Sequence, residues 1–374
     1  MANLMRLALI PLVYMAVSHV LHLLYFGGTF CDSKASLKGR TVIVTGANTG
    51  IGRATAMDMA ARGARVILAC RSERRTLPAL EEIRAKTGNE EVIFMQLDLG
   101  SFASVNQFSE QFLRTEKRLD ILINNAGMIG KEEPQLSVDG IELTLAVNHL
   151  GPFLLTQNLL ELLIKSGPGS RIVNVASLMH HFANPSAFQD LDGSLARDGF
   201  PGIPQDFFLH QKPPRPNFVM DNLIPTVVKQ KMYDSFLSAP QIIRYGNSKL
   251  ANVLFTKELA KRLDGKGVTA YSLHPGVIRT EIGMDRSSGQ AMDSWSRIVD
   301  AIPKFLNPFL FLFKTLEGGA QTTVCCAVSE KHALESGLYY SDCEVSPVTR
   351  EEMNDQYAAQ FYDWSAGVIE KALS

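Results

Sequence analysis

From Lys38 onward, short apolar runs alternate with longer segments that have the spacing of amphipathic helices. The pattern predicts strands at Thr41–Val44, Arg65–Ala69, Glu91–Leu97, Leu119–Ile123, Arg171–Val175 and Val268–Leu273, and helices at Ile51–Arg62, Leu77–Thr87, Ser101–Glu116 and Ser248–Arg262. Such alternation is typical of an α/β, doubly wound parallel sheet with helices on both faces. We expect the functional residues at the carboxyl ends of its strands.

The amino-terminal segment Leu7–Phe26 has 20 residues and no Asp, Glu, Lys or Arg. A helix rises about 1.5 Å per residue, so this one could cross a hydrocarbon core of roughly 30 Å. The alternative is a cleaved signal peptide, but the apolar region of a signal peptide usually has only about 7–15 residues, fewer than this segment. We therefore expect a hydrophobic membrane anchor within 1–30. More basic residues follow the span, within 34–40, than precede it, so the globular part should face the cytosol.

Two later segments break the alternation of strands and helices. The insertion 183–240 holds eight of the 17 prolines of the chain, and we expect either a lid or a surface excursion there. The apolar, aromatic run 298–313 is too short for a clear membrane span. It is either buried core or a surface that dips into a membrane and admits lipid, and we favour the lipid-facing interpretation.

Composition excludes several classes of protein. The chain has 374 residues, 37 Lys+Arg against 38 Asp+Glu, and 46% hydrophobic residues. A net charge of −1 excludes a protein that binds nucleic acid through a broad basic surface. The hydrophobic content excludes an acidic disordered chain. The scattered cysteines form no C-x-x-C pair, so we expect reduced thiols. We also expect no metal site, and we interpret the adjacent His180 and His181 as loop residues.

A glycine-rich loop, Gly46-x-x-x-Gly50-x-Gly52, joins the first predicted strand to the first helix. Glycine permits positive φ and lets backbone amides approach a phosphate, and the helix start favours a pyrophosphate. Alone, three glycines could be a simple turn, but the strand–loop–helix context predicts a nucleotide site. Its expected contacts are Gly46, Asn48, Thr49, Gly50, Ile51 and Gly52.

The end of the second predicted strand indicates which dinucleotide binds. An acidic residue here would bind a ribose 2′-hydroxyl, but this chain has Cys70 and Arg71, the latter 19 residues after Gly52. A cation suits a 2′-phosphate, so NADP(H) is preferred over NAD(H). A solvated basic turn is enough to explain the nearby Arg74 and Arg75.

Several motifs occur in the order known from one family. They are Thr45–Gly52, Asp98, Asn124–Gly127, Asn148, Ser177, Tyr245–Lys249 and Pro275–Gly276. In them the chain resembles a short-chain dehydrogenase/reductase over 38–374, apart from the insertion. Segments 316–328 and 337–343, with Ala69-Cys70-Arg71 and the expected anchor, are similar to the microsomal retinol dehydrogenases. The resemblance implies a Rossmann-like single catalytic domain at an endoplasmic reticulum membrane, with a lipid droplet as the other location and a homo-oligomer left open.

The catalytic chemistry centres on Tyr245 and Lys249, which at i and i+4 share one helix face. A free phenol has a pKa of about 10, and we expect the nearby ammonium to lower the pKa of Tyr245. Tyr245 would then exchange a proton with a carbonyl or alcohol oxygen. The resemblance implies that Lys249 also binds the nicotinamide ribose, that Ser177 hydrogen-bonds the reacting oxygen, and that Asn148 completes a water-mediated relay.

The resemblance implies further cofactor contacts. It assigns Asp98 to the adenine, with a helix cap before Ser101 as the plain alternative, and the two roles are compatible. It also assigns Asn125, Ala126 and Gly127 to the cofactor cleft, with Asn124 structural, and Pro275, Gly276, Val277 and Thr280 to the nicotinamide end. Ser177 and Tyr245 are 68 positions apart, longer than usual, but a surface insertion can carry that length.

These features together predict a membrane-anchored NADP(H)-dependent oxidoreductase. The expected substrate is a hydrophobic alcohol or carbonyl compound such as a retinoid, with membrane lipid as a further partner. A reductase of sterols or other lipid carbonyls is the nearest alternative. A non-catalytic NADP-binding membrane scaffold is the other, although a scaffold has no physical need for the full set of Asn148, Ser177, Tyr245 and Lys249.

Overall fold

The computed structural model describes residues 28–183, 239–276, 278, 314–348 and 355–374. The predicted anchor span Leu7–Phe26, the body of the insertion and the apolar run 298–313 lie outside these ranges. In the described part of the chain, no helix has both the length and the apolar character that a membrane span requires.

One sheet of eight strands organises the fold, in the order β3-β2-β1-β4-β5-β6-β7-β8. Its strands are β1 (Thr41–Thr45), β2 (Arg65–Cys70), β3 (Val92–Gln96), β4 (Ile121–Asn124), β5 (Ser170–Val175), β6 (Val268–His274), β7 (Leu338–Ser341) and β8 (Glu344–Val345). All pairs are parallel except β7 with β8, so the predicted doubly wound sheet is confirmed. Strands β1 to β3 are added toward one edge of the sheet and β4 to β7 toward the other, and in such sheets ligands bind at the carboxyl ends of the strands where the order reverses, here β1 and β4.

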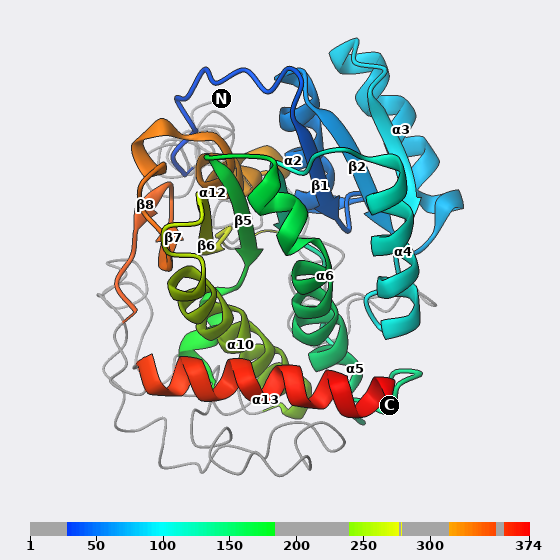
Figure 1. The fold of residues 1–374 in the computed structure, drawn as a ribbon, viewed down its shortest axis with the longest axis vertical. Helices are drawn as coiled ribbons and strands as arrows, with labels where there is room; N and C mark the ends of the chain where they lie inside the picture. The colour runs from blue at the N-terminus through cyan, green and yellow to red at the C-terminus, as the bar shows by residue number, and fades with distance from the viewer. Residues whose placement is uncertain (1–27, 184–238, 277, 279–313, 349–354) are drawn as a thin grey trace, which may run out of the picture.

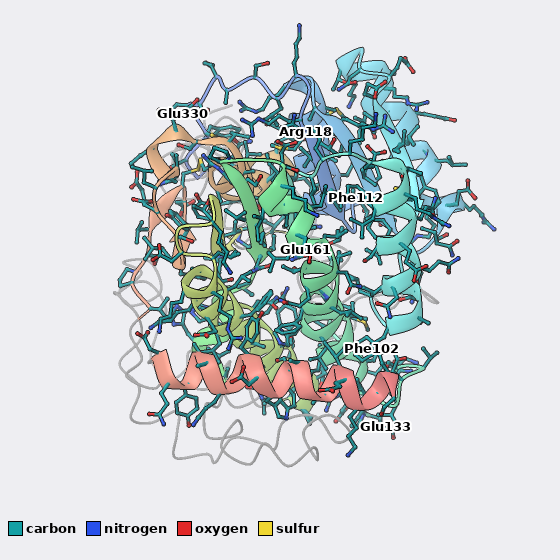
Figure 2. All side chains as sticks on the ribbon, viewed as in Figure 1. Phe102, Phe112, Arg118, Glu133, Glu161 and Glu330 are labelled. Atoms are coloured by element: carbon teal, nitrogen blue, oxygen red, sulfur yellow. A yellow bond between two sulfur atoms is a disulfide. The ribbon has the colours of Figure 1, made fainter. Side chains whose placement is uncertain are left out.

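Helices cover both faces of the sheet (Figure 1). One face carries α4 (Phe102–Thr115), α6 (Gly151–Lys165) and α10 (Pro240–Arg262), and the other carries α2 (Gly50–Ala61), α3 (Glu73–Thr87) and α12 (Leu316–Val328). Each layer encloses its own apolar core, because strands buried on both faces present side chains to both. Phe112 of α4, for example, is fully buried toward the sheet (Figure 2).

A last helix, α13 (Asp355–Leu373), lies across α10 and α6 (Figure 1). Aromatic side chains of α13 pack against aromatic side chains of these two helices. The ring centres of Tyr362 in α13 and Phe153 in α6, for example, are 4.9 Å apart. The sequence analysis did not predict this helix.

Two helices begin earlier than the sequence pattern predicted. Helix α10 begins at Pro240, eight residues before the predicted Ser248, because proline suits the first helical position. Pro240 therefore belongs to a helix and not to the insertion. Helix α3 begins at Glu73 and not at Leu77, with Pro78 inside it.

Two cysteines are joined. Cys325 in α12 and Cys343 after β7 form a disulfide, with their Cα atoms 5.6 Å apart. The expectation that all the cysteines are reduced thiols is therefore wrong. Cys31, Cys70 and Cys326 are free in the described chain. The disulfide pair is separated by 18 positions in the sequence, and only the packing of α12 beside β7 brings its members together.

Candidate active site

The loop between β1 and α2 requires its glycines. Gly46 and Gly50 have φ of +66° and +60°, a region that side chains with a Cβ rarely adopt. A Cβ on Gly52 would lie 2.4 Å from Nδ2 of Asn125 and 2.5 Å from the carbonyl oxygen of Gly46. Thr45 Oγ1 accepts a hydrogen bond from the Asn125 amide at 3.0 Å. The loop is thus tied to the end of β4, with its backbone at the carboxyl edge of the sheet.

The first turn of α2 is suited to an anion. Asn48 and Thr49 precede the helix, and Gly50 and Ile51 begin it. Within the described chain, this turn contains no acidic side chain. The amides at the start of a helix carry partial positive charge, and nothing acidic in this turn neutralises it. A dinucleotide pyrophosphate fits this combination of close backbone and positive helix end.

Arg71 lies beside this loop, just past the end of β2. The Gly46 amide donates to the Ala69 carbonyl oxygen at 2.9 Å, which fixes the loop next to β2. The Arg71 side chain is exposed and, among the residues described, has no ion-pair partner. By contrast, Arg53 of α2 pairs with Glu82 at 2.9 Å. The Arg71 guanidinium is therefore available to an external anion.

Asp98 follows β3 and does not cap α4. Its Oδ1 accepts from the Gly100 amide at 3.0 Å, within its own turn. The cap of α4 is Ser101, whose Oγ accepts from the Ser104 amide at 3.3 Å. The helix-cap alternative for Asp98 is therefore wrong, and its half-buried side chain stays at the carboxyl edge of the sheet.

Asn124, at the end of β4, is structural. Its Nδ2 donates to Asn174 Oδ1 at 2.8 Å and to Thr156 Oγ1 at 3.1 Å, joining β4 to β5 and α6.

The next residues connect the phosphate loop to the catalytic group. A Cβ on Gly46 would lie 3.0 Å from the Cα of Ala126. A Cβ on Gly127 would lie 3.1 Å from Lys249 Nζ and 3.5 Å from Asn148 Oδ1. Segment 125–127 is therefore in contact with both ends of the candidate site.

Helix α10 presents Tyr245 and Lys249 to the end of β5. Tyr245 is 8% exposed and Lys249 is 2% exposed. The Tyr245 side chain is hydrogen-bonded to that of Ser177, which follows β5. Lys249 Nζ donates to the carbonyl oxygen of Val175 at 2.8 Å and lies 5.6 Å from the centre of the Tyr245 ring. The predicted Ser, Tyr and Lys thus meet at one point.

The direction of the Tyr245 pKa differs from the prediction. Burial raises the pKa of Tyr245, and the hydrogen bond from Ser177 opposes that rise. Burial also lowers the pKa of Lys249, to about 8. A buried site disfavours both the phenolate and the ammonium, so the expected lowering by Lys249 is wrong for this structure. A lysine with a pKa near 8 can exchange a proton close to neutral pH.

Asn148 lies in a π-helical turn, Ala146–Leu150, a deviation that is frequent at functional sites. Its Oδ1 accepts from the Met128 amide at 2.8 Å. Its Nδ2 donates to the Met128 carbonyl at 2.9 Å and to Ser248 Oγ at 2.9 Å. Ser248 Oγ in turn donates to the Tyr245 carbonyl oxygen at 2.7 Å. Ser248, which the sequence analysis quoted without a role, therefore links Asn148 to the catalytic helix.

His149, the next residue, connects this turn to the last helix. It is fully buried, with Nδ1 3.2 Å from Asn252 Oδ1 in α10 and Nε2 2.9 Å from Ser365 Oγ in α13. Burial lowers the pKa of His149 to about 4, so the imidazole is neutral near pH 7. The turn that presents Asn148 is thereby fixed to α13.

Two neighbours of Tyr245 were also missed. A Cβ on Gly246 would lie 2.9 Å from the Met179 carbonyl oxygen, so glycine lets α10 approach the short helix after Ser177. A glycine inside a helical pattern is the signal that could have found it. Arg244, 5% exposed, donates to the Glu132 carbonyl at 2.8 Å and faces Glu142 at 3.5 Å, anchoring loop 131–142 beside the site.

The segment after β6 is described only in part. Pro275 and Gly276 follow the strand, with φ of +94° at Gly276, whose amide donates to His274 Nδ1 at 2.9 Å. Val277 and Thr280, both predicted nicotinamide contacts, lie outside the described residues.

Comparisons with known proteins agree with this geometry. A family model described as short chain dehydrogenase matches residues 40–188. Human retinol dehydrogenase 11 is 38% identical over 364 residues, which are 97% of this chain and 96% of that protein. Bovine dehydrogenase/reductase SDR family member 13 is 39% identical over 90% of this chain and 74% of its own. The crystal structure of an uncharacterized Mycobacterium paratuberculosis protein aligns with a TM-score of 0.59 and 26% identity, covering 92% and 98% of the two chains.

The Rossmann-like fold and these similarities define an oxidoreductase that works on alcohols or carbonyl compounds. The chain belongs to the short-chain dehydrogenase/reductase family and is similar to its retinol dehydrogenases.

Proposed function

We propose that this protein is an NADP(H)-dependent oxidoreductase that interconverts a hydrophobic alcohol, of the retinol type, and its carbonyl compound. The observation that carries the proposal is the meeting of Ser177, Tyr245 and Lys249 at the end of β5. The glycine loop, the uncompensated start of α2 and the exposed Arg71 support a dinucleotide with a 2′-phosphate. The relatives named for retinol support the choice of substrate class.

A bound nicotinamide supplies hydride to the carbonyl carbon, or accepts it from the alcohol carbon. Tyr245 donates its phenolic proton to the carbonyl oxygen in reduction, or removes the hydroxyl proton in oxidation. Ser177, hydrogen-bonded to Tyr245, orients the same oxygen. Lys249 holds the ribose of the cofactor and exchanges protons near neutral pH. Asn148 fixes the segment beside Lys249 and contributes to the proton relay.

The protein acts, in this proposal, at a membrane. The apolar span at 7–26 anchors it, and the excess of basic residues after the span places the domain on the cytosolic face of the endoplasmic reticulum. Protease protection of the full chain in sealed microsomes tests this orientation. Digestion of the domain in intact vesicles supports it, and full protection contradicts it.

The test of the activity is a carbonyl and alcohol screen with the full chain in detergent. Retinal, a keto-sterol and a short aldehyde are each assayed with NADPH and with NADH, and the alcohols with the oxidised cofactors. We expect the largest kcat/KM for retinal with NADPH. Preference for the keto-sterol would favour the sterol alternative. NADPH binding without turnover of any compound would favour the scaffold.

A further inference from the structure

The disulfide joins two elements that border the candidate cofactor site. Cys325 lies in α12, which packs against α2, the helix that begins at the phosphate loop. A Cβ on Gly319 of α12 would lie 3.7 Å from Ile51 in the first turn of α2. Cys343 lies in the turn between β7 and β8. The bond therefore fixes this turn to the layer that carries the phosphate loop.

The turn itself has an unusual backbone. Asp342 and Cys343 have φ of +52° and +61°, and in the described chain they are the only non-glycine residues with positive φ. A two-residue hairpin loop of type I′ requires positive φ at both central residues, so the pairing of β7 with β8 holds them there together with contacts from outside the hairpin. The disulfide is one such contact, and His332 Nε2, 3.1 Å from the Cys343 carbonyl oxygen, is another.

Asp342 connects the hairpin turn, through Lys314, to the Pro275–Gly276 turn at the predicted nicotinamide end of the site. Its carboxylate forms an ion pair with Lys314, whose side chain is only 9% exposed. A Cβ on Gly276 would lie 2.7 Å from Cδ and Cε of Lys314, so the lysine stem packs directly on the Pro275–Gly276 turn. The ion pair with Asp342 therefore helps to hold the Lys314 side chain against that turn, and Lys314 limits the conformations of the turn.

We propose that Cys325 and Cys343 are a redox modification site that sets the affinity for the dinucleotide. The oxidised pair keeps Asp342 on Lys314 and the Pro275–Gly276 turn in its binding form, and the reduced pair releases them. The identity of the ligand rests on the function proposed above.

The oxidant is a small-molecule disulfide of the glutathione type. Both cysteines are buried in the closed fold, so exchange takes place when the hairpin opens locally. One cysteine thiolate then attacks a sulfur of glutathione disulfide and releases one glutathione. The second thiolate attacks the mixed disulfide, the Cys325–Cys343 bond forms, and the second glutathione leaves. The two cysteines lose two electrons, glutathione disulfide gains them, and the two thiol protons end on the released glutathiones. A reducing compartment reverses the reaction, so a domain facing the cytosol would respond to its thiol balance.

The experiment measures the NADPH dissociation constant of the full chain by cofactor fluorescence, after equilibration with reduced or oxidised glutathione. Mass spectrometry of alkylated peptides reports the state of the bond. We expect reduction to weaken binding about fivefold or more, the lower end of typical coupling between sites, and reoxidation to restore it. The variant Cys343→Ser should show the weak affinity in both buffers. The control Cys31→Ser removes a nearby free thiol that is not part of the bond, and it should behave as wild type.

A second variant tests the route through Lys314. Asp342→Asn keeps the shape of the turn but removes the charge, so the bond should still form while binding is weakened in both states. Unchanged affinity in Asp342→Asn, or equal affinity of the wild type with the bond open and closed, overturns the proposal alone. A chain that binds no dinucleotide in either state contradicts the proposed function and this proposal together.

Discussion

The phosphate loop follows β1 and the catalytic group lies at the end of β5, with β4 between these strands, and the two regions are formed by different parts of the residues. The loop is formed by backbone and by missing side chains: Gly46, Gly50 and Gly52 leave room, and the helix start supplies charge. The catalytic group is formed by buried polar side chains that hydrogen-bond one another, such as Asn148 through Ser248 to the Tyr245 carbonyl.

This difference has a practical consequence. The loop depends mainly on the conformation of its own strand–turn–helix unit and on Asn125, so changes in the catalytic group should leave phosphate binding intact. The catalytic group depends on the π-helical turn Ala146–Leu150, α10 and the short helix after Ser177 together, and through His149 also on α13. It should therefore respond to changes at a distance.

The largest effect is expected from Tyr245→Phe, which should remove catalysis without changing cofactor binding. The ring and its packing remain, but the transferable proton is gone, so kcat should fall by about 10²–10⁴-fold, the usual contribution of general acid–base catalysis. The NADPH dissociation constant should stay nearly unchanged. Steady-state kinetics and cofactor titration of the folded variant check this. Substantial residual turnover would reject the catalytic role.

Adding a methyl group to a glycine should impair turnover at the catalytic group and cofactor binding at the phosphate loop. In Gly246→Ala the new Cβ would lie 2.9 Å from the Met179 carbonyl oxygen, pushing α10 from the helix after Ser177. We expect kcat to fall by about 10²-fold, as for small misplacements of reacting groups, with NADPH affinity retained. The matched variant Gly52→Ala crowds the phosphate loop and should weaken NADPH binding. Equal loss of cofactor affinity in both would show that the regions are not separate.

The preference for NADPH over NADH should depend on Arg71 beside the phosphate loop and not on the catalytic group. In Arg71→Asp, a charge-assisted hydrogen bond of about 1.5–3 kcal/mol is lost and repulsion of the 2′-phosphate is added. NADPH binding should therefore weaken more than tenfold, and NADH binding much less. Titration of both cofactors measures the ratio. Arg74→Asp is the control, because a solvated turn explains that residue.

The last prediction concerns stability and not turnover: it is about how pH acts on the catalytic end. The pKa of His149 is about 4 in the fold, below the roughly 6.5 of a free histidine, so only the unfolded chain takes up this proton between those values. The contribution of neutral His149 to the free energy of unfolding is fully present above pH 6.5. It is lost as the pH drops toward 4, by about 3 kcal/mol in total. His149→Gln should lose this slope. Urea unfolding at a series of pH values compares the two, and parallel curves would exclude His149 as the source.

Sequence patterns predicted the parts of the site that are continuous in the chain. The phosphate loop and the Tyr245–Lys249 spacing were found because each lies in one short segment and its chemistry follows from residue type. The contact of Asn148 with Ser248 crosses 100 positions, and the disulfide depends on α12 packing beside β7, so no local pattern indicates them. The raised pKa of Tyr245 could not be predicted either, because burial is a property of the folded chain.

The contact between His149 and Ser365 joins residues 216 positions apart, and this has a consequence for folding. Contacts of such long range form slowly, because a large loop must close before they contribute. The strand–turn–helix unit around the phosphate loop, whose hydrogen bond between Thr45 and Asn125 spans only 80 positions, can form earlier. We therefore expect a late folding step that docks α13 and completes the catalytic end. A chain trapped before that step would retain nucleotide affinity while being unable to transfer a proton.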